Sequence, residues 1–421
     1  MTGPRSAGHN RLRMAGVHFV HNNFPSQFRD LAEQLVARGV PCRSIAQAHA
    51  TGDVKGIEFL KYNLPRGTTF GIFPLAVRAE ADFLRATMAL KAARRFKDAG
   101  FEPDVIVGHT GWGETVLLKE AYPEARQVLY PEFFYAGHGL DIGFDTEFKQ
   151  PGEQGILQGT AKNAVSALAM TQADALVCPT PFQASTLPAV FQPLVRLIHE
   201  GVDLDVVRPG QAEPFTLDDG RVIAPGAPVI THVNNNMEPL RGLHILARAL
   251  PKLLAAAPDA QVLLIGHESN HGYSGSAPQD RTWKDVCFEG VEIDPARVHF
   301  LGKVPRARML AAMRLSTAHV YYSYPFVLSW SLAEAMASGC YVIGSDTPPL
   351  RDAIEDGVNG RLLPFFDVDA LSEALIEACR APGVQAPLRQ AARATAERMF
   401  SRETGRRLWL DLLREMGLSG L

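Results

Sequence analysis

The chain has few cysteines, and none of them is paired in the sequence. Its 421 residues include five cysteines, which lie singly at Cys42, Cys178, Cys287, Cys340 and Cys379. No C-x-x-C or Cys/His pair has the spacing of metal ligands. An odd, scattered set of thiols argues against a disulfide framework and fits a reducing compartment. We therefore expect neither disulfides nor a cysteine metal site.

Other absences exclude further classes of protein. No apolar run reaches the roughly 18–20 residues of a membrane-spanning helix. The formal net charge is −3, so the basic excess of a nucleic-acid-binding protein is missing. No G-x-G-x-x-G follows the first expected strand, which argues against a dinucleotide oxidoreductase. Residues 1–14 carry three arginines but no apolar stretch, which predicts a short disordered leader on a cytoplasmic protein.

What is present is ordinary globular composition, with 46% hydrophobic and 21% charged residues, on a chain long enough for two domains. Short apolar segments alternate with helical stripes, which predicts parallel sheets covered by helices on both faces. The expected strands are residues 16–20, 104–108, 127–130, 175–178 and 194–198, then 228–233, 261–265, 298–301, 318–322 and 341–343. A Pro- and Gly-rich break over 209–228 separates the two groups.

The sequence thus predicts an α/β protein of two Rossmann-like, doubly wound domains, over residues 1–208 and 228–397. The polar segment 267–291 is expected to be a loop insertion, and the tail after 387 to be helical with a solvated arginine face. Ligands of such sheets bind beyond the carboxyl ends of the strands. The cleft between the domains is therefore the expected site.

The most informative stretch runs from Tyr324 to Asp346, where a strand is followed by a loop and then by a helix that begins near Ser329. The free N–H groups and the dipole of a helix N-terminus suit a diphosphate. One turn later, Glu334 could accept hydrogen bonds from a ribose diol. The alternative is that Leu328 and its apolar neighbours are core and that Glu334 is a surface acid; the pattern alone leaves both open.

Three motifs in order, Glu334–Gly339, Val342–Asp346 and Glu355–Gly360, resemble the E-A-M-A-x-G … E-D-G-x-x-G signature of retaining GT-B-fold glycosyltransferases of the family 4 type (glycosyl transferases group 1). Pro239–Gly242 resembles the P-x-K-G element of that family. The resemblance implies two Rossmann-like domains facing a central cleft, with a C-terminal helix (398–421) packing back on the first domain. It also implies transfer of a sugar from a nucleotide-diphosphate donor, with retention and without a metal or other cofactor.

The resemblance also implies roles for individual residues. Glu334 matches the second glutamate of the E-x7-E motif, which holds the ribose. Arg241 stands where the family has a lysine for the donor phosphates, and a guanidinium could bind them bidentately. The residues that the resemblance places at the donor are Arg241, Asn236, Gly302, Lys303, Val304, Val327, Leu328, Ser329 and Glu334.

Five departures from the family pattern predict a divergent subgroup. Residues 22–27 replace the N-terminal Gly-Gly loop of the family. Phe326 replaces the first glutamate of E-x7-E, and Asn236 replaces an arginine. Pro348 and Pro349 replace a glycine pair. Glu132 stands where the family has a histidine, and we take Glu132, together with His109 and Arg241, as the catalytic candidates.

The first domain is expected to bind the acceptor. His109 to Glu114 follows a strand directly, so Trp112 could stack on a sugar and Glu114 could act as an acid or base; the alternative is a Gly-rich turn with buried side chains. Asn22 and Asn23 follow the first strand and are expected to face the same cleft. Ser26 is expected to cap the next helix.

The expected partners are a nucleotide-sugar and a glycan, lipid-linked or protein acceptor, without nucleic acid. The arginines of the tail leave open a weak peripheral contact with acidic lipid at the inner face of the membrane. Two other functions stay open: a GT-B protein that binds nucleotide or glycan without turnover, which Phe326 favours, and another reaction on the same fold, such as nucleotide-sugar epimerisation.

Overall fold

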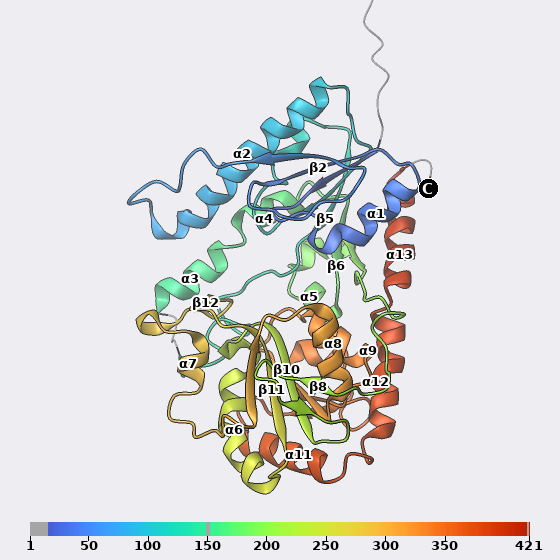
Figure 1. The fold of residues 1–421 in the computed structure, drawn as a ribbon. Coiled ribbons are helices and arrows are strands. Elements are labelled where there is room, and N and C mark those ends of the chain that lie inside the picture. Colours follow the sequence, from blue (N-terminus) through green and yellow to red (C-terminus); the bar gives the residue numbers. More distant parts are fainter. Residues whose placement is uncertain (1–15, 149–151, 419–420) are drawn as a thin grey trace, which may run out of the picture.

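The computed structural model describes residues 16–148, 152–418 and 421; the leader expected over residues 1–14 lies outside this part. Two α/β domains lie one above the other (Figure 1). The upper domain is built around a seven-stranded sheet and the lower one around a six-stranded sheet. The predicted fold of two doubly wound domains is confirmed.

The N-terminal sheet is parallel throughout and has the order β3-β2-β1-β4-β5-β6-β7. Its strands are β1 (Val17–Val20), β2 (Cys42–Gln47), β3 (Glu58–Tyr62), β4 (Val105–His109), β5 (Arg126–Tyr130), β6 (Ala175–Cys178) and β7 (Val195–Leu197). The helices around it are η1 (Ser26–Phe28), α1 (Arg29–Ala37), η2 (Pro74–Ala76), α2 (Val77–Asp98), η3 (Leu118–Glu120), α3 (Glu153–Ala161), α4 (Ala164–Met170), α5 (Pro181–Ser185) and η4 (Ala189–Leu194). The central strands are apolar because helices bury both faces of the sheet.

The C-terminal sheet has the order β14-β11-β10-β15-β16-β17, again parallel. Its strands are β10 (Val229–Asn236), β11 (Gln261–His267), β14 (Val298–Gly302), β15 (Ala318–Tyr321), β16 (Val342–Ser345) and β17 (Arg361–Leu363). The helices are η5 (Pro239–Arg241), α6 (Leu243–Ala256), α7 (Trp283–Cys287), α8 (Arg306–Leu315), α9 (Trp330–Ala337), α10 (Pro348–Arg351) and α11 (Val368–Arg380). The strand order reverses between β10 and β15, which is where a doubly wound sheet binds its ligand.

Two segments expected to be irregular are more ordered than the sequence predicts. The break between the domains contains a short antiparallel hairpin of β8 (Phe215–Thr216) and β9 (Val222–Ile223). The insertion after β11 forms a second hairpin, of β12 (His271–Gly272) and β13 (Gly275–Ser276), followed by η6 (Pro278–Asp280) and α7. The prediction of a plain loop over 267–291 was wrong, because hydrogen bonds to residues outside the segment order it.

The C-terminal tail links the two domains. Helix α12 (Ala386–Met399) lies along the lower domain, and α13 (Arg402–Glu415) continues upward beside α1 (Figure 1). Trp409 is buried and its ring lies 6.2 Å from that of Phe28, between centroids. Arg406 donates to both carboxylate oxygens of Asp30 at 2.5 and 2.6 Å. The domain limits, 1–208 and 228–397 with a tail from 398, stay a prediction.

Two arginines of the tail are structural, whereas Arg398, Arg407 and Arg414 are exposed, so the expectation of a solvated face is correct in part. Arg389 donates to the carbonyls of Ser316 and Thr317, and Arg393 donates to those of Val207 and Ala337. These carbonyls lie at the ends of other elements and need donors once they are covered. These two guanidinium groups therefore fasten α12 to the domain.

A segment of the N-terminal domain, residues 144–148, is anchored in the C-terminal domain, and we call it the strap. The ring of Phe144 lies 5.0 Å from that of Tyr324, between centroids. Asp145 accepts a hydrogen bond from the Tyr324 hydroxyl at 2.7 Å, and His244 Nε2 lies 3.0 Å from the same carboxylate oxygen. Burial raises the pKa of Asp145, but the hydrogen bonds from His244 and Tyr324 outweigh it and hold that pKa below its usual range. The strap thus joins the domains through buried polar and aromatic contacts.

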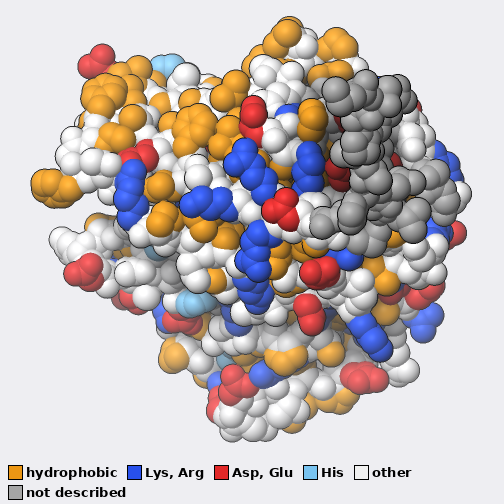
Figure 2. Space-filling model, turned by 90° about the horizontal axis from the view of Figure 1, so that it is seen from above, with side chains coloured by type: hydrophobic (Ala, Val, Ile, Leu, Met, Phe, Trp, Pro, Cys, Tyr) orange, Lys and Arg blue, Asp and Glu red, His pale blue; other side chains and the backbone are white. Residues whose placement is uncertain are grey.

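The upper face of the N-terminal domain is unevenly apolar. Among the described residues, large exposed apolar side chains gather in the segment before α2 and on α2 itself: Phe70, Phe73, Val77 and Phe83. Figure 2 shows apolar side chains collected on the left of this face, the side toward which α2 and the loop before it project in Figure 1. No helix in the described ranges combines the length and apolarity needed to cross a bilayer.

Candidate functional site

Two adjoining pockets lie between the domains, at the carboxyl ends of both sheets. The arginine pocket, of about 170 Å³, is lined by Glu132, Asn235, Asn236, Glu238, Arg241, Tyr273, Val327, Leu328, Ser329 and Trp330. The histidine pocket, of about 140 Å³, is lined by Ser26, Gln27, Tyr130, Glu132, Pro179, Gln183, His199, Glu200, Val327, Leu328 and Trp330. Four residues line both: Glu132, Val327, Leu328 and Trp330. The pockets are therefore two halves of one cleft.

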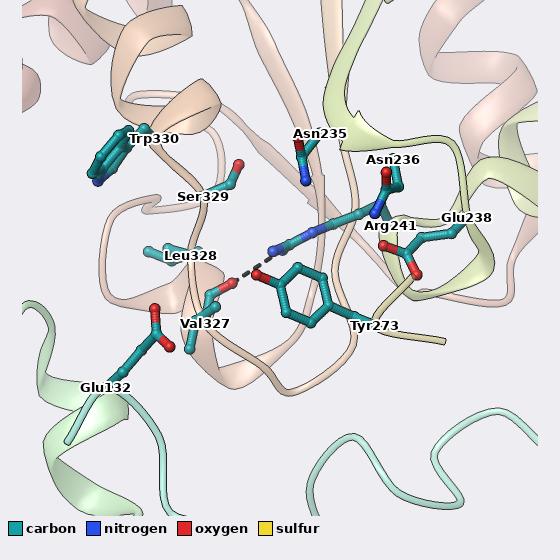
Figure 3. Close-up of a pocket in the computed structure, with 10 residues that line it drawn as sticks. All are labelled: Glu132, Asn235, Asn236, Glu238, Arg241, Tyr273, Val327, Leu328, Ser329 and Trp330. Atoms are coloured by element: carbon teal, nitrogen blue, oxygen red, sulfur yellow. Dashed lines mark hydrogen bonds between the residues drawn. The ribbon is translucent and has the colours of Figure 1, made fainter. Parts of the chain in front are cut away.

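Arg241 is the cation of the arginine pocket and is held rigidly. Its Nη1 donates to the Tyr321 hydroxyl at 3.0 Å, to Ser323 Oγ at 2.8 Å and to the Val327 carbonyl at 3.0 Å. Because these bonds all come from Nη1, the rest of the guanidinium fork stays available to a ligand. Figure 3 shows the side chain crossing the pocket toward Val327, with Asn235 and Asn236 beside it.

The turn that carries Arg241 depends on a glycine. Gly242 has φ of +69°, the left-handed region that other residues avoid. A Cβ at this position would lie 2.3 Å from Cβ of Tyr322, which is closer than atoms can approach. The P-x-R-G sequence therefore fixes where the guanidinium enters the cleft.

The N-terminus of α9 opens onto the same pocket. Ser329 is the N-cap residue, has extended backbone and makes no side-chain capping bond to the helix. Its N–H instead bonds the Tyr321 hydroxyl at 2.8 Å, the same hydroxyl that accepts from Arg241. The positive end of the helix dipole and the guanidinium thus face one volume, an arrangement suited to an anion.

The β12–β13 hairpin closes one side of the arginine pocket, which the sequence did not predict. Glu238 is buried and its carboxylate accepts from Ser274 N–H at 2.7 Å. Burial raises the pKa of Glu238, and the hydrogen bond from Ser274 and the charge of Arg241 oppose that rise. Tyr273, at the turn of the hairpin, consequently lines the pocket. The Gly272–Gly275 turn around an aromatic residue was the available sequence signal.

Phe326, the departure from the E-x7-E motif, lies in an aromatic cluster behind the pocket. Its ring centroid lies 4.8 Å from that of Phe133 and 5.1 Å from that of Tyr273. The side chain is buried, and Arg241 lies 6.0 Å from its ring centroid. Where the family has a carboxylate, this chain therefore has an apolar support for the hairpin and the arginine.

Glu132 lies at the junction of the two pockets in a strained conformation. Its φ is +59°, which is uncommon for a residue with a Cβ and typical of functional sites. Gln183 holds the backbone by donating to the Glu132 carbonyl at 2.8 Å. The Glu132 side chain is 41% exposed, and its Oε2 lies 3.5 Å from Nε2 of the buried His109. The strain thus presents a carboxylate to the cleft.

Three histidines at strand ends share one local geometry. In each case Nδ1 accepts a hydrogen bond from the N–H two residues later: His21 from Asn23, His109 from Gly111 and His199 from Gly201, at 2.8–2.9 Å. A neutral ring whose Nδ1 accepts must carry its proton on Nε2. His-x-Asn and His-x-Gly after a strand are signals that could have identified His21 and His199, which the sequence analysis did not select.

Other predicted acceptor residues lie outside both pockets. Asn22 is buried and donates to Gln47 Oε1 at 2.9 Å, whereas Asn23 is exposed. Trp112 packs on the ring of His109 with centroids 4.4 Å apart. Glu114 is fully buried and accepts from the Tyr62 hydroxyl at 2.7 Å, which indicates a structural role.

Ser26 differs from its predicted role. It has φ of +40° in η1 and does not cap α1, whose N-cap is Phe28. The capping prediction was wrong because a short 3-10 turn precedes the helix; Ser26 instead lines the histidine pocket.

Part of the predicted donor set lies beyond the arginine pocket. Glu334 is buried one turn along α9, where Arg306 donates to its Oε1 at 2.8 Å. Gly302 ends β14 with φ of +61°, and Lys303 and Val304 follow it at the edge of the sheet. Asn236, Val327, Leu328 and Ser329 line the pocket.

Two family models match adjacent parts of the chain. One, described as Glycosyl transferase family 4 group, matches residues 38–207, and the other, described as Glycosyl transferases group 1, matches residues 227–380. Sucrose-phosphate synthase from Thermosynechococcus elongatus superposes with a TM-score of 0.71 at 17% identity, covering 96% of this chain and 99% of that one. HepE from Anabaena in complex with UDP and glucose gives 0.63 at 17% identity, covering 94% and 99%.

The chain has the fold of GT-B glycosyltransferases, and each of its two domains matches a glycosyl transferase family model. Among curated relatives, a phosphatidyl-myo-inositol mannosyltransferase of Mycolicibacterium smegmatis is 36% identical over 143 residues, 33% of either chain. A D-inositol 3-phosphate glycosyltransferase of Saccharomonospora viridis is 28% identical over 253 residues, 58% of this chain and 56% of the relative. The matches thus span a third to about half of the relatives' lengths. The arginine pocket lies in the GT-B cleft, between the two domains.

Proposed function

We propose that this protein is a retaining glycosyltransferase that moves a sugar from a nucleotide-diphosphate donor to a hydroxyl acceptor. The observation that carries the proposal is Arg241, a fixed guanidinium aimed into the interdomain cleft beside the N-terminus of α9. Such a pair of preorganised positive groups suits the charge that develops on a leaving diphosphate. HepE from Anabaena, a fold neighbour solved in complex with UDP and glucose, supports the same donor class.

In the proposed reaction, the donor diphosphate lies in the arginine pocket. Arg241 and the Trp330 N–H in the first turn of α9 bind the phosphate oxygens, so no metal is required for charge compensation. Glu334 is proposed to turn from Arg306 toward the ribose, and Gly302, Lys303 and Val304 to meet the base. We expect Asn236 to orient the phosphates or the sugar beside Arg241.

The reacting carbon is then placed at the junction of the pockets, beside Glu132. This carboxylate lies where positive charge would develop on the sugar, and His109 supports it from behind at 3.5 Å. Retention is proposed through attack on the face that the leaving phosphate vacates, with that phosphate taking the proton of the acceptor. Trp330 and Leu328, which line both pockets, separate the donor from bulk water.

The acceptor is proposed to enter through the histidine pocket. The names of the curated relatives favour an inositol-type or lipid-linked acceptor; glycan and protein acceptors are the alternatives. A peripheral contact with lipid is proposed for the apolar side chains before and on α2; the exposed arginines of the tail are the alternative. Exposed aromatic side chains on a projecting loop suit a membrane interface.

The test starts from a melting screen of the full chain against UDP, GDP and ADP. A ligand at 100 times its Kd stabilises the native state by about 2.7 kcal/mol. The nucleotide with the correct base should therefore raise the melting temperature clearly above the others. Glu334→Gln should reduce the shift, and Glu213→Gln, an exposed carboxylate in the interdomain segment, is the matched control. If no nucleoside diphosphate raises the melting temperature, the proposal is wrong.

A second candidate function is binding without turnover, which the apolar residue Phe326 favours, since a sugar-binding carboxylate is replaced. Incubation with the matching nucleotide-sugars separates the two functions. Transfer to an acceptor, or slow hydrolysis of the donor, supports the transferase. Tight binding with neither reaction supports the binding protein.

A further inference from the structure

Lysine and arginine are absent from the histidine pocket. None of its eleven lining residues is a cation, whereas two of them, Glu132 and Glu200, carry carboxylates. Burial lowers the pKa of His199, although the neighbouring Glu200 opposes that effect, so the ring is neutral near pH 7. The two halves of the cleft therefore differ in charge: Arg241 and a helix N-terminus on one side, and carboxylates on the other.

The neutral groups of this pocket offer both donors and acceptors. His199 accepts from Gly201 N–H at Nδ1, at 2.8 Å, so its Nε2 carries a hydrogen. Burial, followed by the charges of Glu200 and Glu132, raises the pKa of Tyr130, so its hydroxyl keeps the proton, donates it to Glu200 and can accept a hydrogen bond at its oxygen. Gln27 and Ser26 add an amide and a hydroxyl.

Glu200 is fixed in place by the opposite domain. The indole N–H of Trp330, the first residue of α9, donates to Glu200 Oε1 at 2.7 Å. Trp330 also lines both pockets, so its ring forms a wall shared by the donor and acceptor sides. A carboxylate held by two donors, here Trp330 and Tyr130, is preorganised to accept a hydroxyl at its remaining lone pairs.

We infer that the histidine pocket takes an uncharged polyhydroxyl acceptor, such as an inositol or sugar ring, and discriminates against its phosphate esters. Each hydroxyl donates one hydrogen bond and accepts others, which matches a pocket of carboxylates, amide, phenol and imidazole N–H. A phosphate in the same pocket would face two carboxylates with no cation to pair with, and such like-charge contacts are costly. This inference rests on the proposed function and adds the acceptor class to it.

The experiment uses the full chain, saturated with the nucleoside diphosphate that the melting screen identifies. Binding of myo-inositol, glucose and methyl glucoside is compared by ligand-observed NMR with binding of inositol 1-phosphate and glucose 6-phosphate. Transfer from the matching nucleotide-sugar is then measured for whichever acceptors bind. We expect each neutral compound to have a kcat/KM roughly tenfold or more above that of its phosphate ester.

Two variants test whether the charge of the histidine pocket causes the preference for neutral acceptors. Glu200→Gln should weaken the binding of the neutral acceptors and reduce the ratio of their kcat/KM to that of the phosphate esters. The affinity for the nucleotide should stay unchanged. Gln27→Lys places a cation in the pocket and should shift the preference toward the esters. Glu213→Gln, an exposed carboxylate that does not line the pocket, is the matched control and should change neither ratio.

The possible outcomes separate the two proposals. If the phosphate esters bind as well as or better than the neutral compounds, or if no compound binds while the nucleotide does, the acceptor inference is overturned and the transferase proposal stands. The same holds if Glu200→Gln and Gln27→Lys leave the preference unchanged. If no nucleotide binds at all, the transferase proposal is wrong and the acceptor inference is wrong with it.

Discussion

Replacing Arg241 by methionine removes the cation of the arginine pocket while keeping most of the side-chain volume. At about 4 Å from a phosphate and an effective dielectric constant near 20, one unit charge contributes about 4 kcal/mol. Hydrogen bonds to charged groups contribute about 1.5–3 kcal/mol in protein measurements. We therefore expect a loss of about 2–4 kcal/mol, which is roughly a 30- to 700-fold increase in the Kd of the nucleoside diphosphate.

The same substitution also affects the free protein. Tyr321, Ser323 and the Val327 carbonyl lose the donor that Nη1 provides. Buried polar groups without partners are costly, so the melting temperature of Arg241→Met should fall even without ligand. Arg241→Lys keeps the charge but loses the planar fork, and we expect it to weaken binding by only about tenfold.

Isothermal titration with the nucleoside, its monophosphate and its diphosphate distinguishes these effects. A lost phosphate contact should leave the Kd of the nucleoside nearly unchanged and increase the Kd of the diphosphate. Titrations are made well below the melting temperature of each variant, at two salt concentrations. If Arg241→Met increases the Kd of the nucleoside as much as that of the diphosphate, or changes neither Kd, Arg241 does not bind the phosphates.

Three other predictions concern the supports of the cleft. Asp145→Asn should lower the melting temperature at pH 7 more than at pH 2. The pKa of Asp145 is held down by His244 and Tyr324, so its stabilisation is complete above the unfolded value near 3.9 and is lost as the pH falls through the folded pKa; an equal loss at both pH values would contradict the strap. Trp409→Ala should lower the free energy of unfolding by about 3–5 kcal/mol in urea titrations, because the ring is buried between α13 and the N-terminal domain; a change below 1 kcal/mol would show that α13 is not docked in solution. Gly242→Ala should abolish the nucleotide-induced melting shift, since the new Cβ collides with Tyr322; an unchanged shift would refute the link between this turn and the site.

Much of the fold was predictable because the strands are buried on both faces. Parallel strands such as β4 and β10 begin with short, largely apolar segments of sequence. Such a segment can be recognised as a strand whichever helix covers it. The hairpin of β12 and β13 was missed for the opposite reason. Its order comes from the contact of Ser274 with Glu238, which lies 36 residues away in the chain.

The arginine pocket was predictable in part, since several of its residues belong to local motifs. Arg241 precedes a left-handed glycine, and Val327 to Ser329 precede a helix, so backbone geometry alone brings them to strand ends. Glu114 was misjudged, because a Gly-rich segment after a strand does not reveal that its carboxylate turns inward to Tyr62. Side-chain direction within a loop is set by what packs around it.

The sequence by itself determined two doubly wound sheets and the approximate position of a helix N-terminus beside an arginine, because strand burial and glycine turns act over short stretches of chain. Only the tertiary structure decided that Trp330 meets Glu200, that Tyr273 closes the arginine pocket and that the histidine pocket lacks cations. Those features need side chains from both domains, and the position of one domain against the other follows from the strap and from α13. The separation of charge across the cleft, which defines the proposed acceptor, is therefore a property of the packed domains and not of any motif.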